Sequence, residues 1–108
     1  MATAPDQFAS AAEFTVRPMS DDDVAEVVGI ERASYPFPWT EGIFRDCLRV
    51  AYLCRVAVQN QSIVGYAVMS MGAGEAHVLN LRVREPARRA GIGRGLICTR
   101  AWTLCSPE

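Results

Sequence analysis

Residues 83–95 read Val-Arg-Glu-Pro-Ala-Arg-Arg-Ala-Gly-Ile-Gly-Arg-Gly: the end of an expected strand, a basic turn, two spaced glycines and the expected first turn of a helix. Gly91 and Gly93 lack a Cβ and can adopt backbone angles that other residues avoid. Successive N–H groups can therefore converge on phosphate oxygens near the positive end of a helix dipole. Further positive charge would come from Arg88, Arg89 and Arg94. The stretch predicts a cradle for a pyrophosphate group.

The spacing alone leaves a second interpretation open, because an arginine-rich turn with a Gly-x-Gly can also be a solvated connection between a strand and a helix. Two named nucleotide motifs fit less well. A P-loop requires a lysine after its last glycine, and the chain contains no lysine. The dinucleotide fingerprint requires Gly-x-Gly-x-x-Gly and an acidic residue about 20 positions later, which would fall beyond residue 108.

Length and composition indicate one soluble globular domain, since the chain has 108 residues and half of them are apolar. We expect a disordered leader over residues 1–12 and the domain over residues 13–108. No apolar stretch is long enough to cross a membrane, and the N-terminus lacks the pattern of a secretory signal. The expected location is therefore the cytoplasm, with no membrane partner.

The cysteines do not predict a metal site. None of them forms a Cys-x-x-Cys pair, and His77 is the only histidine. Buried, reduced thiols are the expected state of Cys47, Cys54, Cys98 and Cys105.

Charge is unevenly distributed along the chain. Nine of the twelve acidic residues lie before residue 50, whereas six of the eleven arginines lie between residues 82 and 100. The densest group of aromatic residues lies elsewhere, in Tyr35-Pro36-Phe37-Pro38-Trp39, so the arginines do not form the basic and aromatic face typical of nucleic-acid binding. The pattern favours a local anionic ligand and no direct contact with nucleic acid.

Hydrophobic periodicity predicts the order β-α-α-β-β-β-α, an α/β fold with a mixed sheet. The first strand covers residues 13–18, a helix capped by Ser20 follows, and a second helix begins after Thr40. Residues 52–58 and 63–71 form a hairpin, and Gly72-Ala73-Gly74 turns the chain into a strand over residues 75–84. The last helix is expected from Ile92 to about Leu104.

Two features of these elements bear on function. Glu31 falls on the apolar stripe of the first helix, together with Val24, Val27 and Val28, and is expected either at the rim of the core or pointing into a site. Strict alternation in the strand over residues 75–84 would place Glu75, His77, Leu79, Leu81 and Val83 on one face.

Three segments together resemble the GCN5-related N-acetyltransferase (GNAT) superfamily. Its acetyl-CoA motif, Arg/Gln-x-x-Gly-x-Gly/Ala after the fourth strand, is matched by Arg88-Arg89-Ala90-Gly91-Ile92-Gly93. Residues 30–39, Ile-Glu-Arg-Ala-Ser-Tyr-Pro-Phe-Pro-Trp, and residues 80–83, Asn-Leu-Arg-Val, are similar to the RimI-like branch, which acetylates the N-terminal alanine of a ribosomal protein. The resemblance covers about residues 14–97.

The resemblance implies that acetyl-CoA is the cosubstrate, that no metal is needed, and that the acceptor is a protein N-terminus, with a ribosomal protein as the candidate. It implies that the cofactor is held by Leu81, Arg82, Val83, Arg88, Arg89, Ala90, Gly91, Ile92, Gly93 and Arg94. A backbone N–H near residues 81–83 would stabilise the oxyanion while an amine attacks the thioester. His77 is the first candidate for the base, because the strand is similar to the His-x-x-x-Leu/Ile-x-Val strand of N-terminal acetyltransferases, and Glu75 and Glu31 are the candidates behind it. A buried core histidine is the structural alternative.

The chain departs from the superfamily at its C-terminal end. Members continue with a fifth strand, a further helix and a hairpin, so this sequence is expected to hold a GNAT-like fold that lacks the C-terminal strands and helix. The edge of the fourth strand would then be open to a dimer or to another partner. Besides an N-terminal acetyltransferase, a non-catalytic CoA-binding or partner-completed fragment and an unstable fragment without function remain open.

Overall fold

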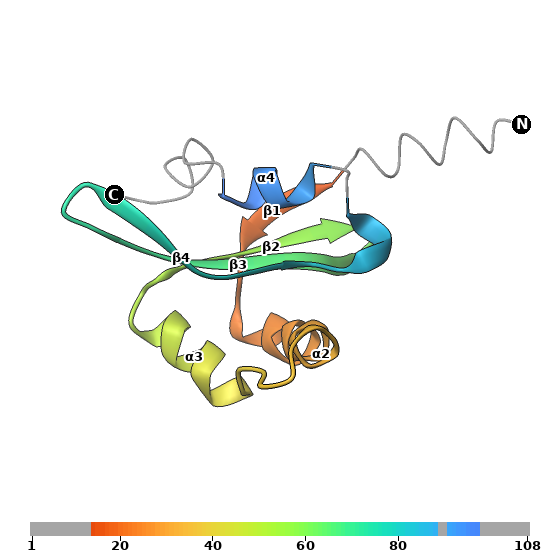
Figure 1. The fold of residues 1–108 in the computed structure, drawn as a ribbon, viewed down its shortest axis with the longest axis horizontal. Coiled ribbons are helices and arrows are strands. Elements are labelled where there is room, and N and C mark those ends of the chain that lie inside the picture. Colours follow the sequence, from red (N-terminus) through yellow and green to blue (C-terminus); the bar gives the residue numbers. More distant parts are fainter. Residues whose placement is uncertain (1–13, 89–90, 98–108) are drawn as a thin grey trace, which may run out of the picture.

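A four-stranded antiparallel sheet with helices on both faces forms the fold of the computed structural model, which describes residues 14–88 and 91–97. The strands lie in the order β1-β2-β3-β4, with α4 on one face and α2 and α3 on the other (Figure 1). Along the chain the elements are β1 (Thr15–Pro18), the 3-10 turn η1 (Asp21–Asp23), α2 (Val24–Ser34), α3 (Glu41–Arg49), β2 (Leu53–Gln59), β3 (Ser62–Gly72), β4 (Glu75–Val83), the 3-10 turn η2 (Glu85–Ala87) and α4 (Ile92–Ile97).

The predicted order β-α-α-β-β-β-α is confirmed. The expected leader and the part of the last predicted helix beyond Ile97 lie outside the described residues. No helix in the described ranges is long and apolar enough to span a membrane.

Both hairpin turns follow from backbone conformation. Asn60 and Gln61 have φ values of 54° and 66°, and Ala73 and Gly74 have φ values of 52° and 78°. Two successive residues with positive φ form the two-residue turn whose twist suits antiparallel strands. The turns fix the registers of the β2–β3 and β3–β4 hairpins, in which Gln59 pairs with Ser62 and Gly72 pairs with Glu75.

A bulge in β4 corrects the predicted alternation of this strand. Asn80 pairs with Val68 of β3, but the next pair joins Val78 to Met69, which leaves Leu79 as the extra residue. A bulged residue shifts the side-chain alternation by one position. His77, opposite Ser70, therefore shares the α2 and α3 face with Asn80, and not the face of Leu81 as the sequence pattern predicted.

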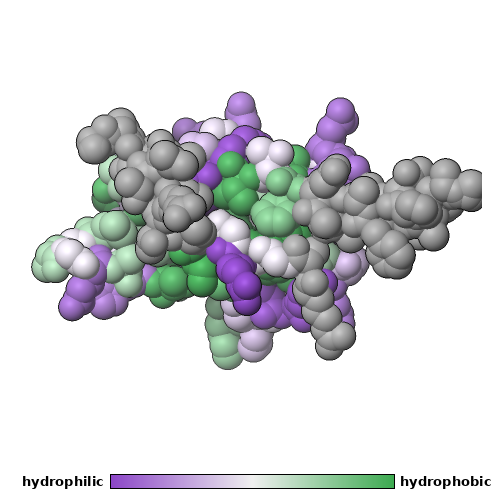
Figure 2. Space-filling model, turned by 90° about the horizontal axis from the view of Figure 1, so that it is seen from above, coloured by the Kyte–Doolittle hydropathy of each residue, from purple (hydrophilic) through white to green (hydrophobic). Residues whose placement is uncertain are grey.

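Each face of the sheet carries its own apolar cluster. On the α2 and α3 face, Phe44 packs edge-on against Trp39 and Tyr66, with ring centroids 5.2 and 5.6 Å apart. The buried residues of the other face are Ala57, Ala67, Met69, Ile92 and Leu96. Viewed from the α4 side, apolar residues show near the middle of the molecule, with hydrophilic residues both among them and along the borders (Figure 2).

The predicted helix starts are confirmed, with one refinement at each helix. Ser20 precedes a 3-10 turn, and its backbone N–H donates to the Asp23 carboxylate at 2.8 Å. Thr40 caps α3 by accepting from the Ile43 N–H at 3.3 Å, and the Ile43 side chain is exposed.

The described cysteines are free and buried, as predicted for Cys47 and Cys54. Burial raises the pKa of the Cys54 thiol to about 12, and it also raises that of Cys47. Both thiols therefore stay protonated and inert near neutral pH. Cys98 and Cys105 lie outside the described residues.

Candidate active site

A hollow of about 310 Å³ lies where β4 ends and α4 begins. It brings together most of the residues predicted to hold the cofactor: Leu81, Arg82, Val83, Arg88, Gly91, Ile92 and Gly93, with Ala87 between them. Arg94 is exposed on α4 and does not line this hollow. Arg89 and Ala90 lie outside the described residues.

The backbone on the α4 side of this hollow is arranged to present N–H groups. Gly91 has φ +82°, a conformation that residues with a Cβ rarely adopt. The Gly95 N–H donates to the Gly91 carbonyl at 3.0 Å, which makes Gly91 the residue before the first helical turn. N–H groups in the first turn of a helix have no partner within the helix and can bind an anion.

The β4 side of the hollow also offers backbone groups. The Arg84 N–H donates to Val64 of β3 at 2.8 Å, and in an antiparallel ladder alternate residues direct their polar groups to opposite sides. Leu81 and Val83 therefore direct theirs away from β3, to the outer edge of β4, where no further strand lies among the described residues. Two side chains already reach these carbonyls: Tyr35 Oη contacts Leu81 O at 3.4 Å, and Arg88 Nε donates to Val83 O at 2.9 Å.

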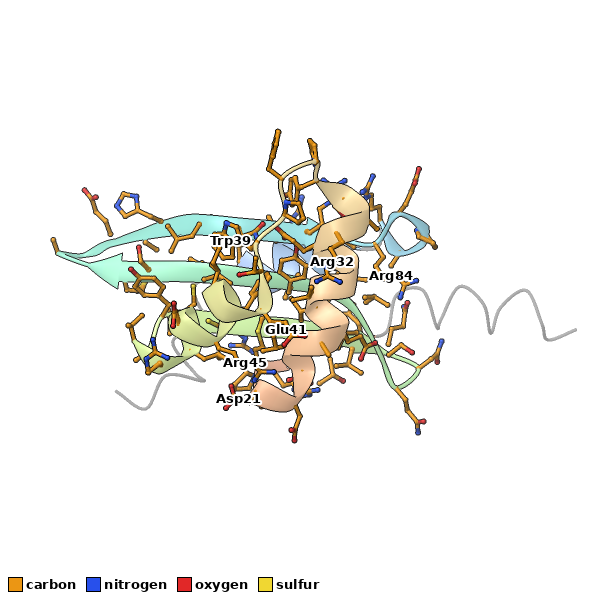
Figure 3. All side chains as sticks on the ribbon, turned by 90° about the horizontal axis from the view of Figure 1, so that it is seen from below. Asp21, Arg32, Trp39, Glu41, Arg45 and Arg84 are labelled. Atoms are coloured by element: carbon orange, nitrogen blue, oxygen red, sulfur yellow. The ribbon has the colours of Figure 1, made fainter. Side chains whose placement is uncertain are left out.

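A second, larger hollow of about 630 Å³ adjoins the same end of β4 on the α2 side. Arg82 and Arg88 line both hollows, and Arg84 contributes to the second (Figure 3). The Arg82 guanidinium lies 5.3 Å from the centroid of the Tyr35 ring, a distance at which a cation and an aromatic face attract each other. The Arg82 Nε is buried and has no hydrogen-bond partner among the described residues.

Glu31 is buried below the sheet, with 2% of its surface exposed. Its carboxylate accepts hydrogen bonds from the Tyr66 hydroxyl, from Asn80 Nδ2 at 2.9 Å and from the Trp39 N–H at 2.9 Å. The expectation of a residue at the rim of the core was therefore wrong. The signal was present in the sequence, since Glu31 occupies the apolar stripe of α2, but the donors that satisfy it come from distant segments.

The loop between α2 and α3 combines a packed and a free aromatic residue. Trp39 packs edge-on against Phe44 and lies over the sheet (Figure 3). Phe37, two residues earlier, is 92% exposed. Trp39 therefore serves the core, while Phe37 is available to contact a ligand.

His77 and Glu75 lie near the far end of β4, and the structure brings them close to each other but not to the cradle. The His77 Nε2 is 3.2 Å from Glu75 Oε1, and both side chains are largely exposed. At about 3.3 Å per residue, His77 is about 13 Å along the strand from Leu81. The expectation of an inward-facing histidine is not met within the described residues.

No group of three or more His, Cys, Asp and Glu side chains within residues 14–88 and 91–97 is placed to bind a metal ion.

Comparisons with known proteins show which family and which solved structures the chain resembles. Residues 24–99 match the family described as "Acetyltransferase (GNAT) family". An uncharacterized N-acetyltransferase of Methanocaldococcus jannaschii is 31% identical over 85 residues, which cover 78% of this chain and 54% of that protein. The chain thus spans about half the length of this curated relative.

Two solved structures have the same fold over most of the chain. The ribosomal-protein-S18-alanine N-acetyltransferase from Escherichia coli is 27% identical with a TM-score of 0.69, over 78% of this chain and 54% of that one. Ard1 from Thermoplasma volcanium is 30% identical with a TM-score of 0.70, over 85% of this chain and 63% of that one.

Proposed function

Since the chain belongs to the acetyltransferase (GNAT) family, we propose that it transfers an acetyl group from acetyl-CoA to the N-terminal α-amino group of a protein, of the ribosomal-protein alanine type. The name of the Escherichia coli structure supports this acceptor. The similarity of residues 30–39 to the RimI-like branch supports it as well. Other amines remain outcomes of the test below.

The hollow at the start of α4 carries the proposal, because it offers what the phosphates and the pantetheine arm of CoA require. Gly91 and the following N–H groups suit the pyrophosphate, and Arg88, Arg89 and Arg94 would balance its charge. The outward polar groups of Leu81 and Val83 suit an extended, amide-containing arm, which would lie along β4 as an added strand does.

Acetyl-CoA, when bound, supplies an activated thioester. The residues of the chain would orient its carbonyl and remove the proton of the amine. An outward N–H in the segment from Leu81 to Val83 would stabilise negative charge on the thioester oxygen. A protein α-amino group has a pKa of about 7.7 to 8.0, against about 10.4 for lysine, so a modest base acting through water is sufficient.

His77 remains the proposed base. Glu75, predicted as a further candidate for the base, is here proposed to orient the His77 ring. The bulge at Leu79 supports this assignment, because it puts His77 on the same face of β4 as Asn80 and the α2–α3 loop. The 3.2 Å contact between Glu75 and the His77 ring would favour the tautomer whose other nitrogen accepts a proton.

One observation favours a second candidate function, a CoA-binding module that is completed by a partner. The outer edge of β4 has no strand beside it among the described residues, and Val78 and Leu79 on this strand are exposed. Such an edge can accept a strand from a second copy or from another protein. Binding of acetyl-CoA without turnover would identify this function.

Calorimetric titration of the 108-residue chain with acetyl-CoA tests the cradle. We expect Gly91→Trp to abolish binding. Gly74→Trp is the matched control, because Gly74 has a similar φ of +78° and open surroundings but lies at the opposite end of β4. Equal affinity of wild type and Gly91→Trp would overturn the assignment of the cradle.

Turnover is then measured on a peptide with a free N-terminal alanine and on the same peptide with a blocked N-terminus and an internal lysine. Acetylation of the first alone is expected. His77→Gln should reduce kcat at least tenfold and leave the affinity for acetyl-CoA unchanged, because His77 lies away from the cradle. Unchanged kcat would exclude His77 as the base.

A further inference from the structure

Glu31 is an unusual residue for the interior of a small sheet protein. It is 2% exposed, and it forms no ion pair among the described residues. Burying a carboxylate is unfavourable unless hydrogen bonds replace the lost water, and apolar residues of similar volume often stabilise such a position equally well. The carboxylate differs from an apolar residue in one respect: it accepts hydrogen bonds from three parts of the chain.

Three donors from three different segments converge on the two oxygens of Glu31. Oε1 accepts from Tyr66 on β3 and from Asn80 on β4, and Oε2 accepts from the backbone N–H of Trp39. Burial and the neighbouring carboxylate raise the pKa of Tyr66, so its phenol stays a donor at neutral pH. All three hydrogen bonds therefore depend on one acceptor group.

The loop that carries Trp39 has few other ways to hold its backbone. Pro36 and Pro38 have no N–H to donate. The Tyr35 N–H belongs to the end of α2, since it donates to the Glu31 carbonyl at 3.1 Å. The hydrogen bond from Trp39 to the Glu31 side chain is thus the backbone attachment of the loop to the interior, and the exposed Phe37 lies between these two fixed points.

Asn80 connects this attachment to the part of β4 that would bind the cofactor. It precedes Leu81, whose carbonyl is contacted by the Tyr35 hydroxyl at 3.4 Å. Glu31 therefore holds the loop at a fixed position relative to Asn80 and to the outward polar groups that follow it in β4. The coupling is short, because one side chain contacts both segments.

We propose that Glu31 is a positioning residue that fixes the loop over residues 35–40 against β4 and thereby sets the acceptor side of the site relative to the cofactor side. The inference rests on the proposed function, and it takes this loop, which carries the exposed Phe37, as the border of the acceptor site. Glu31 does not contact the reacting atoms in this arrangement.

The test uses three variants of the 108-residue chain. Glu31→Gln keeps the volume but replaces one acceptor oxygen by an NH2 donor. This donor would face at least one of the three groups that now donate to Glu31, so that hydrogen bond would be lost. The double variant Glu31→Gln with Asn80→Asp reverses donor and acceptor between the two positions and should restore the attachment of the loop. Glu26→Gln is the matched control, because Glu26 also lies on α2 and accepts a backbone N–H, that of Ile63, at 3.0 Å.

Amide hydrogen exchange gives a result that does not depend on activity. We expect the Trp39 amide to exchange at least tenfold faster in Glu31→Gln, to return to the wild-type rate in the double variant, and to be unchanged in Glu26→Gln. The Tyr35 amide, whose acceptor is a backbone carbonyl, is the internal reference. An unchanged Trp39 rate in Glu31→Gln, or no recovery in the double variant, overturns the proposal.

Kinetics separate positioning from general stability. Glu31→Gln should raise the acceptor KM at least fivefold while the Kd for acetyl-CoA stays within twofold of wild type, and equal losses in both would overturn the positioning role. If wild type transfers no acetyl group, the proposed function fails, but the exchange result still decides whether Glu31 holds the loop. If Glu31→Gln does not fold, Glu31→Asp takes its place, because it keeps the charge but shortens the side chain and withdraws the acceptor oxygen from the Trp39 N–H. The Trp39 amide should then exchange faster, and an unchanged rate overturns the proposal.

Discussion

Asp23 links the first strand to the start of α2. Its carboxylate accepts two hydrogen bonds from the Arg17 guanidinium, at 2.8 and 2.9 Å, and one from the Ser20 N–H at 2.8 Å. These contacts, with the hydrogen bond from Arg17 as the largest, lower the pKa of Asp23 from 3.8 to about 2. The charged carboxylate is therefore favoured in the folded chain.

This shift predicts how stability depends on pH. Because the folded pKa of Asp23 is depressed, its contribution is fully present above about pH 5 and is lost as the pH falls toward 2. Asp23→Asn should lower the free energy of unfolding at pH 7 by about 1 to 2 kcal/mol, a value reduced for solvent screening because Arg17 is 43% exposed. Urea unfolding at pH 7, 4 and 2.5 measures this. The difference between variant and wild type should shrink on acidification, and a constant difference would contradict the assignment.

Close packing of β3, β4 and α4 depends on one glycine. A Cβ on Gly65 would lie 2.9 Å from the Arg82 carbonyl and 3.3 Å from side-chain atoms of both Val83 and Leu96. The first of these neighbours is backbone, so the sheet itself would have to move. The absence of a side chain at Gly65 thus lets α4 pack closely against β3 and β4.

We expect Gly65→Ala to lower the free energy of unfolding by about 1 to 3 kcal/mol, the usual effect of overpacking. Gly29→Ala is the counterpart, because Gly29 lies within α2 and nothing is within 4 Å of the position of its Cβ. That change should raise stability by about 0.5 to 1 kcal/mol, since alanine favours helix over glycine. Chemical unfolding monitored by circular dichroism compares the two variants. A Gly65→Ala variant as stable as wild type would show that α4 does not depend on this contact.

The elements themselves could be predicted from the sequence because their signals are local. Ser20 and Thr40 mark helix starts, and Asn60 and Gly74 lie in the turns that the pattern required. The bulge at Leu79 has no such signal, since the residues on either side of it alternate normally and only the pairing with β3 shows the shift. The hydrogen-bond partners of Glu31 were unpredictable for the same reason, because Tyr66 and Asn80 approach it only after the sheet forms.

The candidate site likewise combines features that local sequence predicts with features that depend on how the strands pair. The residues of the glycine-containing turn are neighbours in sequence, and most of them line one hollow. His77 was assigned by its place in a strand motif, which specifies neither its exposure nor the face to which it points. Its exposure in the fold, and its place beside Asn80, follow from the bulge and from the length of the β3–β4 hairpin.

At the scale of the molecule, the described residues show acidic side chains gathered near the start of α2 and arginines gathered near the end of β4. Arg45 lies between Asp21 and Glu41, at 3.3 and 3.5 Å, so the cation near the start of α2 is surrounded by acidic groups (Figure 3). Arginines border both hollows near the end of β4, where Glu26 and Glu85 are the acidic residues of the larger one. The net charge of −1 hides this separation. Arginines gathered near one site attract an anionic ligand to that site, although the net charge of the protein is close to zero.

Binding of acetyl-CoA should therefore weaken as salt is added. The Debye length falls from about 10 Å at 0.1 M to about 3 Å at 1 M, so salt screens the attraction between the arginines and the phosphates. Raising sodium chloride from 50 to 500 mM should increase the Kd about three- to tenfold, measured by calorimetry.

Two substitutions identify the source of this dependence. Arg94→Gln should weaken binding at low salt and flatten the dependence of the Kd on salt, because it removes an exposed charge from α4. Arg45→Gln should change neither the affinity for acetyl-CoA nor its dependence on salt, because the charge of Arg45 is paired with acidic residues in another part of the molecule. If Arg94→Gln retained the wild-type slope, the arginine would make no contribution to the field at the cradle. A wild-type affinity that did not change with salt would mean that backbone groups, and not the collected arginines, provide the recognition of the phosphates.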